Sequence, residues 1–167
     1  MRHYTVRDVM TADPATVTPA TPLKDLTGIL IQHKVSSVPV LGLSGKVVGL
    51  AAETDLLRKE ELKRDPDVRH SMHMTFRARR ALATAETAGE IMTTPPVTVP
   101  AGATAAEAAR LMDLHQVTCL PVVDEYGKLL GVVTPQDLLR IFLRPDDTRL
   151  PAAADMTDYH RACRPSA

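Results

Sequence analysis

The sequence predicts an α/β protein built from two pseudo-symmetric copies of one β-α-β-β-α unit. The first observation behind this prediction is an internal repeat. Residues 9–58 align without a gap on residues 91–140, and 16 of the 50 aligned positions are identical, where chance gives about three. The second is the order of patterns in each copy: a strand, an amphipathic helix, a hairpin and a second helix. Two copies indicate a symmetric pair, because solenoids generally need three or more units.

The first helix of each copy is predicted from its N-terminal cap and its apolar face. In the first copy Thr21 is the expected N-cap, and Pro22 takes the first helical position. In the second copy Thr104 and Glu107 form a capping box. The cap is therefore expected to shift by one residue between the copies while the helix is retained. The apolar faces comprise Leu23, Leu26, Ile29 and Leu30 in the first copy and Ala105, Ala108, Leu111 and Met112 in the second.

A β-hairpin is predicted after each of these helices. The β-rich runs 35–41 and 117–123 are each followed by a four-residue turn and a second β-rich run. Pro39 and Pro121 lie inside the first run of each hairpin. Because proline lacks the N–H that a central strand donates, this strand is predicted to lie at the edge of its sheet.

Composition and charge exclude several classes of protein. The chain has 167 residues, 20 Lys+Arg against 20 Asp+Glu, and 44% hydrophobic residues. This apolar fraction is too high for a disordered chain, and no stretch is apolar enough for a membrane helix or a signal core. We therefore expect a soluble, cytoplasmic protein. Cys119 and Cys163 are too few for a disulfide framework, and the balanced charge argues against nucleic-acid binding by the whole surface.

A candidate binding site lies where the last hairpin strand meets the last helix. Thr134 and Asp137 place a hydroxyl and a carboxylate at one helix N-terminus, whose free N–H groups attract anions. A carboxylate can accept the vicinal hydroxyls of a ribose, while the hydroxyl and the backbone amides can bind phosphate. The alternative is a plain helix cap with Thr134 at N-cap and Asp137 at N3, and spacing alone favours this alternative.

Four motifs recur in the same order in both copies. They are the Val-Met-Thr segments that begin at Val9 and Ile91, the strands that end in Pro-Val, the Gly-Lys-x-x-Gly hairpins, and a Gly-x-x-Thr-x-x-Asp turn at residues 131–137. Together they resemble the tandem cystathionine-β-synthase (CBS) domain pair, or Bateman module. The resemblance implies two units packed sheet to sheet, two clefts between them, and frequent dimerisation into a disc. It also implies that Thr134 and Asp137 hold ribose and phosphate.

The resemblance divides the chain into four segments. These are a first repeat at 6–62, a basic linker at 63–87, a second repeat at 88–142, and a poorly ordered tail at 143–167.

The first copy departs from the pattern at its equivalent turn. Asp55 keeps the carboxylate, but Ala52 replaces the cap hydroxyl and Glu53 adds a negative charge. A phosphate there would lose a hydrogen bond worth about 1.5 kcal/mol or more, so the second-copy cleft is ranked first. Arg140, one turn after Asp137, is a candidate phosphate ligand. The residues expected to form apolar slots for a purine are Val99, Val117 and Pro121 in the second copy and Val17, Val35 and Pro39 in the first.

No catalytic motif or metal-ligand set stands out. The chain has no GxSxG, no Walker loop and no HExxH, so we expect a non-enzyme with no required cofactor. The His-x-Met-His-Met run at 70–74 could suit a soft metal, but nothing else in the linker completes a ligand set. Metal binding is therefore not expected.

Two functional hypotheses follow. The first is a regulatory module that binds an adenosyl compound (AMP, ADP, ATP or S-adenosylmethionine) between the repeats, as a homodimer acting on an unidentified protein. The second is a ligand-independent dimeric scaffold that engages a protein or nucleic acid through the linker, where residues 58–82 carry eight Lys/Arg against four Asp/Glu. Salt-dependent affinity would reveal phosphate contacts in the second case.

Overall fold

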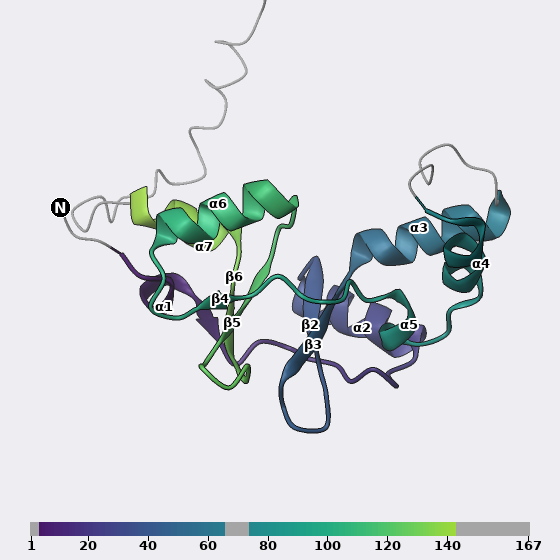
Figure 1. Cartoon of the computed structure of the whole chain (residues 1–167), viewed down its shortest axis with the longest axis horizontal. Coiled ribbons are helices and arrows are strands. Elements are labelled where there is room, and N and C mark those ends of the chain that lie inside the picture. Colours follow the sequence, from purple (N-terminus) through teal and green to yellow (C-terminus); the bar gives the residue numbers. More distant parts are fainter. Residues whose placement is uncertain (1–3, 66–73, 143–167) are drawn as a thin grey trace, which may run out of the picture.

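The computed structural model describes residues 4–65 and 74–142, and these residues form two α/β halves that lie side by side (Figure 1). The first repeat contributes α2 (Leu23–His33), β2 (Ser37–Leu41), β3 (Val47–Ala52) and α3 (Glu53–Arg64). The second contributes β4 (Val99–Pro100), α6 (Ala105–His115), β5 (Leu120–Val123), β6 (Leu129–Val133), α7 (Pro135–Leu139) and a 3₁₀ helix η2 (Arg140–Phe142). Elements outside these sets are α1 (Val6–Val9), β1 (Thr11–Ala12), α4 (Phe76–Thr84) and α5 (Ala88–Ile91).

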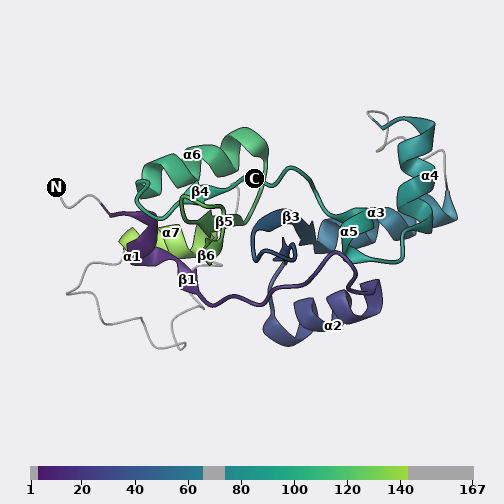
Figure 2. The ribbon, with the colours of Figure 1, turned by 60° about the horizontal axis from the view of Figure 1, so that its bottom comes forward.

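The segment that leads into each repeat packs against the other repeat. In Figures 1 and 2 the purple α1 lies among the green elements of the second repeat, while α5 lies beside α2 and α3. The backbone N–H of Val6 donates to the carbonyl of Ala103, and that of Ala88 donates to Thr21, both at 2.8 Å. These two bonds join residues related by the 82-residue shift of the repeat. The exchange of lead-in segments is therefore reciprocal.

Strand pairing extends this exchange. The larger sheet has the order β1-β6-β5-β4, so β1 from the first repeat joins three strands of the second. In return Thr93 of the second repeat forms an antiparallel bridge with Leu50 of β3, and β2 pairs with β3 in a two-stranded sheet. The two hairpins also meet, because the N–H of Val47 donates to the carbonyl of Gly127 at 3.1 Å.

Two hydrophobic cores follow from this arrangement, and each contains side chains from both repeats. Val6 is fully buried in the core of the second repeat, and Ala88 in the core of the first. Buried members of the first core are Val17, Leu26, Leu30, Val38, Val40, Ala51, Leu62, Leu82, Ala85, Ala88 and Ile91. Those of the second core are Val6, Val99, Ala101, Ala108, Met112, Leu120, Val122, Val133 and Leu138.

The prediction that the first hairpin strand is an edge strand is wrong in the second repeat. Strand β5 lies between β6 and β4, and it pairs in parallel with β4. The first repeat shows how proline is tolerated beside such a parallel partner. The carbonyl of Pro39 accepts from Val17 N–H at 3.1 Å, and Leu41 N–H donates to the carbonyl of Val17 at 2.8 Å. This ladder therefore needs the proline carbonyl and not the N–H that proline lacks.

The predicted cap of the first helix is also wrong by one residue. Helix α2 has Pro22 at its N-cap, and the Thr21 hydroxyl instead accepts from Thr18 N–H at 3.0 Å. Helices α2 and α6 are therefore in register with the repeat, and the expected slip is absent. The capping box of Thr104 and Glu107 is confirmed.

Part of the predicted linker is helical. Helix α4 packs against α3, with Leu82 and Leu62 in the first core. Lys59 Nζ donates to the carbonyl of Ala83 at 3.3 Å and ties the two helices together. This helix was not predicted from the sequence. Across the described residues, no helix is both long enough and apolar enough to cross a bilayer.

Candidate ligand site at the repeat interface

The second-repeat turn forms a closed hydrogen-bond pair between Thr134 and Asp137. Thr134 caps α7, and its hydroxyl and backbone N–H both donate to Asp137 Oδ2, at 2.7 and 2.9 Å. Asp137 Oδ1 faces Arg140 Nη1 at 3.4 Å. Asp137 is only 4% exposed, whereas the Arg140 side chain is mostly exposed. Oδ1 can therefore exchange the arginine for a ligand hydroxyl while Oδ2 stays bound to the cap.

The first-repeat turn keeps the carboxylate and lacks the hydroxyl. Ala52 N–H donates to Asp55 Oδ2 at 3.0 Å, and Arg58 Nη1 lies 3.7 Å from Oδ1. Asp55 is 7% exposed. Burial raises the pKa of the Asp55 carboxyl, while the Ala52 N–H and the Arg58 charge oppose that rise. Without a hydroxyl at position 52, this carboxylate has fewer donors than its counterpart Asp137.

We expect this buried carboxyl to make stability depend on pH. Because the folded-state pKa of Asp55 lies above the ordinary value of 3.8, its stabilising contribution is fully present below pH 3.8 and is lost as the pH rises through the folded-state pKa. Asp55→Asn keeps an acceptor for Ala52 and removes the titration. Relative to this variant, the wild-type protein should therefore lose stability as the pH rises above about 4.

Urea unfolding of both proteins at several pH values between 4 and 7 measures this difference. Parallel stability curves for wild type and Asp55→Asn would contradict the assignment.

The apolar residues predicted to hold a purine occupy different environments. Val17 and Val99 are buried in the two cores. Pro39 and Pro121 are fully buried within β2 and β5. Val35 and Val117 instead line two grooves on the helical surface. The structure thus brings Thr134, Asp137 and Arg140 together, and it places Val35 and Val117 on the helical surface.

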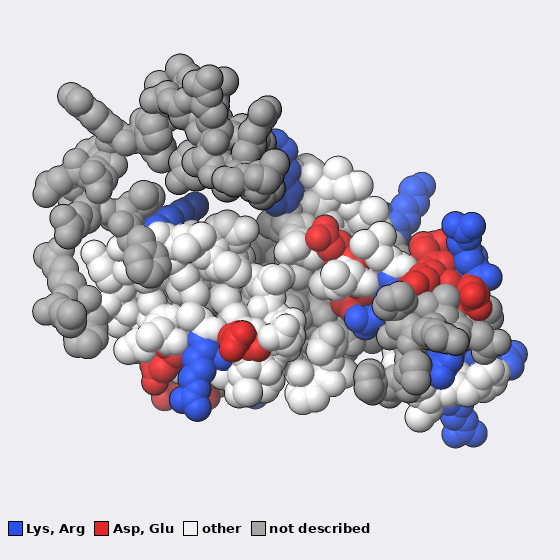
Figure 3. Space-filling view, turned by 90° about the horizontal axis from the view of Figure 1, so that it is seen from above, with Lys and Arg blue, Asp and Glu red and all other residues white. Residues whose placement is uncertain are grey.

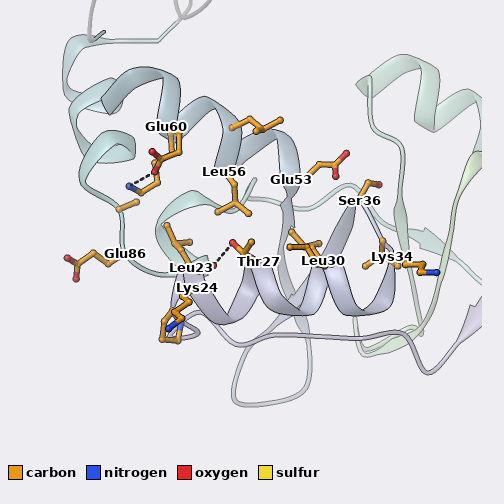
Figure 4. A pocket seen from close by; sticks show the side chains of 16 residues that line it. Leu23, Lys24, Thr27, Leu30, Lys34, Ser36, Glu53, Leu56, Glu60 and Glu86 are labelled. Atoms are coloured by element: carbon orange, nitrogen blue, oxygen red, sulfur yellow. Dashed lines mark hydrogen bonds and ion pairs between the residues drawn. The ribbon is translucent and has the colours of Figure 1, made fainter. Parts of the chain in front are cut away.

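The larger groove lies between α2 and α3 and has a volume of about 890 Å³. Figure 4 shows Leu23, Thr27 and Leu30 from α2 facing Leu56 from α3, with charged side chains such as Glu53 and Glu86 at its ends. The nearby side chains of Ile31 and Leu57 are 73% and 68% exposed. An apolar floor with charged ends is typical of a protein contact surface.

The second groove repeats the first. It lies between α6 and α7, has a volume of about 530 Å³, and is lined by Met112, Leu138 and Leu139 among others. Each of its lining residues is the 82-residue counterpart of a residue lining the first groove. The full set is Ala109, Met112, Asp113, Gln116, Val117, Thr118, Pro135, Leu138 and Leu139. The repeat therefore produces two equivalent apolar grooves, which were not predicted from the sequence.

Ser37 and Cys119 meet where the two repeats join. They are counterparts in the repeat alignment, and residues related in this way can touch only beside the pseudo-twofold axis. Burial raises the pKa of the Cys119 thiol, the adjacent Ser37 hydroxyl opposes this rise, and the Asp137 charge adds to it. Ser37 Oγ is buried beside this thiol. Cys119 was predicted to be a buried filler, and its burial is confirmed.

The model of one protein family matches both repeats. The CBS domain model matches residues 6–61 and again residues 88–144. The chain belongs to the CBS domain family. The resemblance seen in the motifs is thereby confirmed, and the Thr134 and Asp55 turns are equivalent turns of two CBS repeats.

Curated relatives match this chain over only part of their own length. The chloroplastic CBS domain-containing protein CBSX2 of Arabidopsis thaliana is 32% identical over 154 residues, covering 84% of this chain and 64% of the relative. CBSX1 of the same plant is 29% identical, with 65% of it covered. The L-aspartate semialdehyde sulfurtransferase of Methanocaldococcus jannaschii is 25% identical over 82% of this chain but only 23% of the enzyme. The chain thus spans less than two thirds of these relatives.

Several solved structures share this fold. CBSX2 in complex with AMP has a TM-score of 0.74 at 30% identity, covering 84% of this chain and 97% of that one. The CBS pair of MJ0100, in complex with 5′-methylthioadenosine and S-adenosyl-L-methionine, has a TM-score of 0.66 at 25% identity, with 84% and 97% covered. Hypoxic Response Protein I, with two coordinated zinc ions, has a TM-score of 0.63 at 26% identity, with 82% and 98% covered.

Metal ligands do not cluster in the part of this CBS pair that the structure describes. No group of three or more His, Cys, Asp or Glu side chains there could hold a metal ion. The His-Met run at 70–74 lies almost wholly outside the described residues, as does Cys163.

Proposed function

We propose that this CBS pair is a regulatory module that binds an adenosyl compound, chiefly at Thr134 and Asp137. The observation that carries the proposal is the buried Asp137 carboxylate, one oxygen of which is fixed by the Thr134 cap while the other faces a displaceable arginine. A carboxylate held in this way suits the two hydroxyls of a ribose. The AMP complex of CBSX2 and the adenosyl complexes of MJ0100 support the ligand class.

A thermal-shift screen with AMP, ADP, ATP and S-adenosylmethionine tests this proposal. A ligand present at about 100 times its Kd should stabilise the protein by about 2.7 kcal/mol. Asp137→Asn preserves the shape of the side chain and removes its charge, so it should abolish most of the shift. Asp55→Asn is the matched control in the other repeat and should keep most of it. An absence of stabilisation by every adenosyl compound would contradict the proposal.

We further propose that two copies associate through the paired helical grooves. Ile31, Leu57 and Leu139 expose large apolar side chains beside the two grooves. Two equivalent apolar surfaces on one chain suit a symmetric dimer, in which the same patches meet across a twofold axis. A ligand that changes the relative position of the repeats would then alter the spacing of the grooves, and that change is what a regulated partner would detect.

The alternative scaffold function rests on the basic linker. Figure 3 shows that charged side chains of both signs gather over α3 and α4. Helix α4, which carries Arg77 and Arg80, packs against α3, which carries Glu60 and Glu61. Mixed charge gives a weaker attraction to phosphate than a single-sign patch, so this surface favours the regulatory proposal over nucleic-acid binding.

A further inference from the structure

The two helical grooves match in position but differ in charge. Every residue that lines the second groove has a counterpart in the first, through the 82-residue shift of the repeat. At three of these shared positions one groove has a charged residue where the other has an uncharged one. The three pairs of counterparts are Ile31 and Asp113, Lys34 and Gln116, and Glu53 and Pro135. The two grooves are therefore not interchangeable as contact surfaces.

The second groove carries an uncompensated negative charge. Among the described residues that line it, Asp113 is the only charged one, so the lining has a net charge of −1. Arg140, which follows Leu139 in the chain, is paired with Asp137 at 3.4 Å. The lining of the first groove is balanced, with three lysines and three glutamates, namely Lys24, Lys34, Lys59, Glu53, Glu60 and Glu86.

Asp113 and Lys34 both have unpaired side chains at the surface of the single chain. Asp113 lies in the last turn of α6, and Lys34 is the C-cap of α2. Both residues are exposed. Within the described part of the chain, neither side chain forms an ion pair or a hydrogen bond. Each is therefore available to a second molecule.

A twofold dimer in which the surface carrying both grooves meets its own copy allows two arrangements. Either like grooves face each other, or the first groove of one copy faces the second groove of the other. Like pairing brings two Asp113 carboxylates to one interface, where the described lining residues include no cation, and such like charges repel. Unlike pairing places Asp113 opposite the groove that carries Lys34. Charge complementarity therefore favours unlike pairing.

We propose that the dimer is antiparallel, with the first groove of each copy against the second groove of the other copy and Lys34 paired with the partner's Asp113. The inference rests on the proposed function, which supplies the dimer, and it adds the orientation of the two copies.

This orientation determines where a signal from the ligand site goes. Helix α7 lines the second groove through Leu138 and Leu139, and it also carries the buried Asp137 carboxylate. A ligand bound at Asp137 therefore acts through α7 on the first repeat of the other copy, and not on its second repeat.

Site-directed crosslinking determines the orientation. Leu57 and Leu139 are exposed counterparts that line the two grooves. Leu57→Cys and Leu139→Cys are made separately, each together with Cys163→Ser, while the buried Cys119 is kept. A bismaleimide crosslinker is applied to each protein alone and to an equal mixture, and covalent dimer is quantified by intact mass.

The antiparallel arrangement predicts a distinct pattern of crosslinking. Neither single variant should give covalent dimer by itself, because Leu57 faces the second groove of the other copy. The mixture should give covalent dimer in up to about half of its subunits, the share of mixed dimers expected from random exchange. The double variant with both substitutions is the positive control, because it crosslinks in either arrangement.

Neutralising Asp113 provides a second readout whose sign differs between the two arrangements. Asp113→Asn removes the partner of Lys34 from an antiparallel dimer, so sedimentation velocity should show a dimer Kd raised by about 3- to 10-fold. In a dimer of like grooves, the same change removes a repulsion and lowers the Kd. Glu125→Gln, at an exposed position in the second hairpin turn outside both grooves, is the matched control and should leave the Kd unchanged.

Three results would overturn the antiparallel arrangement. They are efficient crosslinking of either single variant by itself, an unchanged or lower Kd in Asp113→Asn, and a mixture that gives no covalent dimer although the wild-type protein dimerises. Failure of the proposed dimer is a different result, in which the wild-type protein sediments as a monomer at high concentration.

Discussion

Gly131→Ala is expected to lower the free energy of unfolding by about 2–3 kcal/mol, near the upper end of the range for overpacked interiors. Gly131 lies in β6, between β1 and β5. A Cβ at this position would lie 2.6 Å from the carbonyl oxygen of Thr11 and 3.1 Å from Met10 Sδ. The Thr11 oxygen is backbone within a paired strand, so it cannot move without breaking the β1–β6 ladder that holds the exchanged segment. Urea denaturation monitored by circular dichroism measures the loss.

Two other glycines provide graded controls for this prediction. A Cβ at Gly49, the counterpart of Gly131, would overlap the Met92 side chain, which is flexible. Gly49→Ala should therefore cost less than Gly131→Ala. Gly28 lies on the exposed side of α2, where an added Cβ would have no atom within 4 Å, so Gly28→Ala should raise stability by about 0.5–1 kcal/mol. Equal losses at Gly131 and Gly49 would show that the exchanged backbone is not the constraint.

Replacing both Leu57 and Leu139 with glutamate is expected to weaken the proposed dimer by at least about 100-fold. These counterparts are 68% and 61% exposed in the single chain and lie in the two grooves. A charge forced into an apolar interface loses hydration without gaining a partner, and one buried charge typically costs several kcal/mol. Sedimentation velocity over a range of protein concentrations measures the change in dimer Kd.

Leu43→Glu is the matched control for this experiment. Leu43 is fully exposed in the first hairpin turn, outside both grooves. The same change there should leave dimerisation intact. None of the variants should alter the far-ultraviolet circular dichroism, because all three leucines are solvent-exposed in the single chain. A wild-type protein that sediments as a monomer at high concentration, or a double variant that dimerises like wild type, would contradict the proposal.

Short-range patterns predicted the local elements well because those elements depend on neighbouring residues. The capping box at Thr104, the hairpins and the long helices of both repeats follow from caps, periodicity and turn residues close together in the chain. The position of Pro22 was misjudged because the Thr21 hydroxyl has a competing acceptor role toward Thr18. Strand β5 was misplaced at an edge because its parallel neighbour β4 is contributed by a segment about twenty residues away.

The candidate site was predictable only in part. The turn from Thr134 to Asp137 was recognised as a motif in the sequence. The structure adds that the Thr134 hydroxyl donates to Asp137 Oδ2 and that Arg140 lies beside Asp137 Oδ1. The contact of Ser37 with Cys119 was not predicted. Its signal was present, since the two residues are counterparts in the repeat, but alignment alone does not show which counterparts meet at the axis.

The order of residues along the chain was enough to establish that there are two copies of one unit. It also predicted the elements that each copy forms and the family to which the copies belong. Repetition, caps and turn residues are local properties, so the sequence alone carries them. Only the folded arrangement established that the lead-in segments cross to the opposite repeat, so that Val6 and Ala88 each complete the core of the other half. The contact between Ser37 and Cys119 likewise arises from the pairing of the copies. These features depend on contacts between residues about eighty positions apart, and such contacts are selected by packing and backbone hydrogen bonding rather than by local pattern.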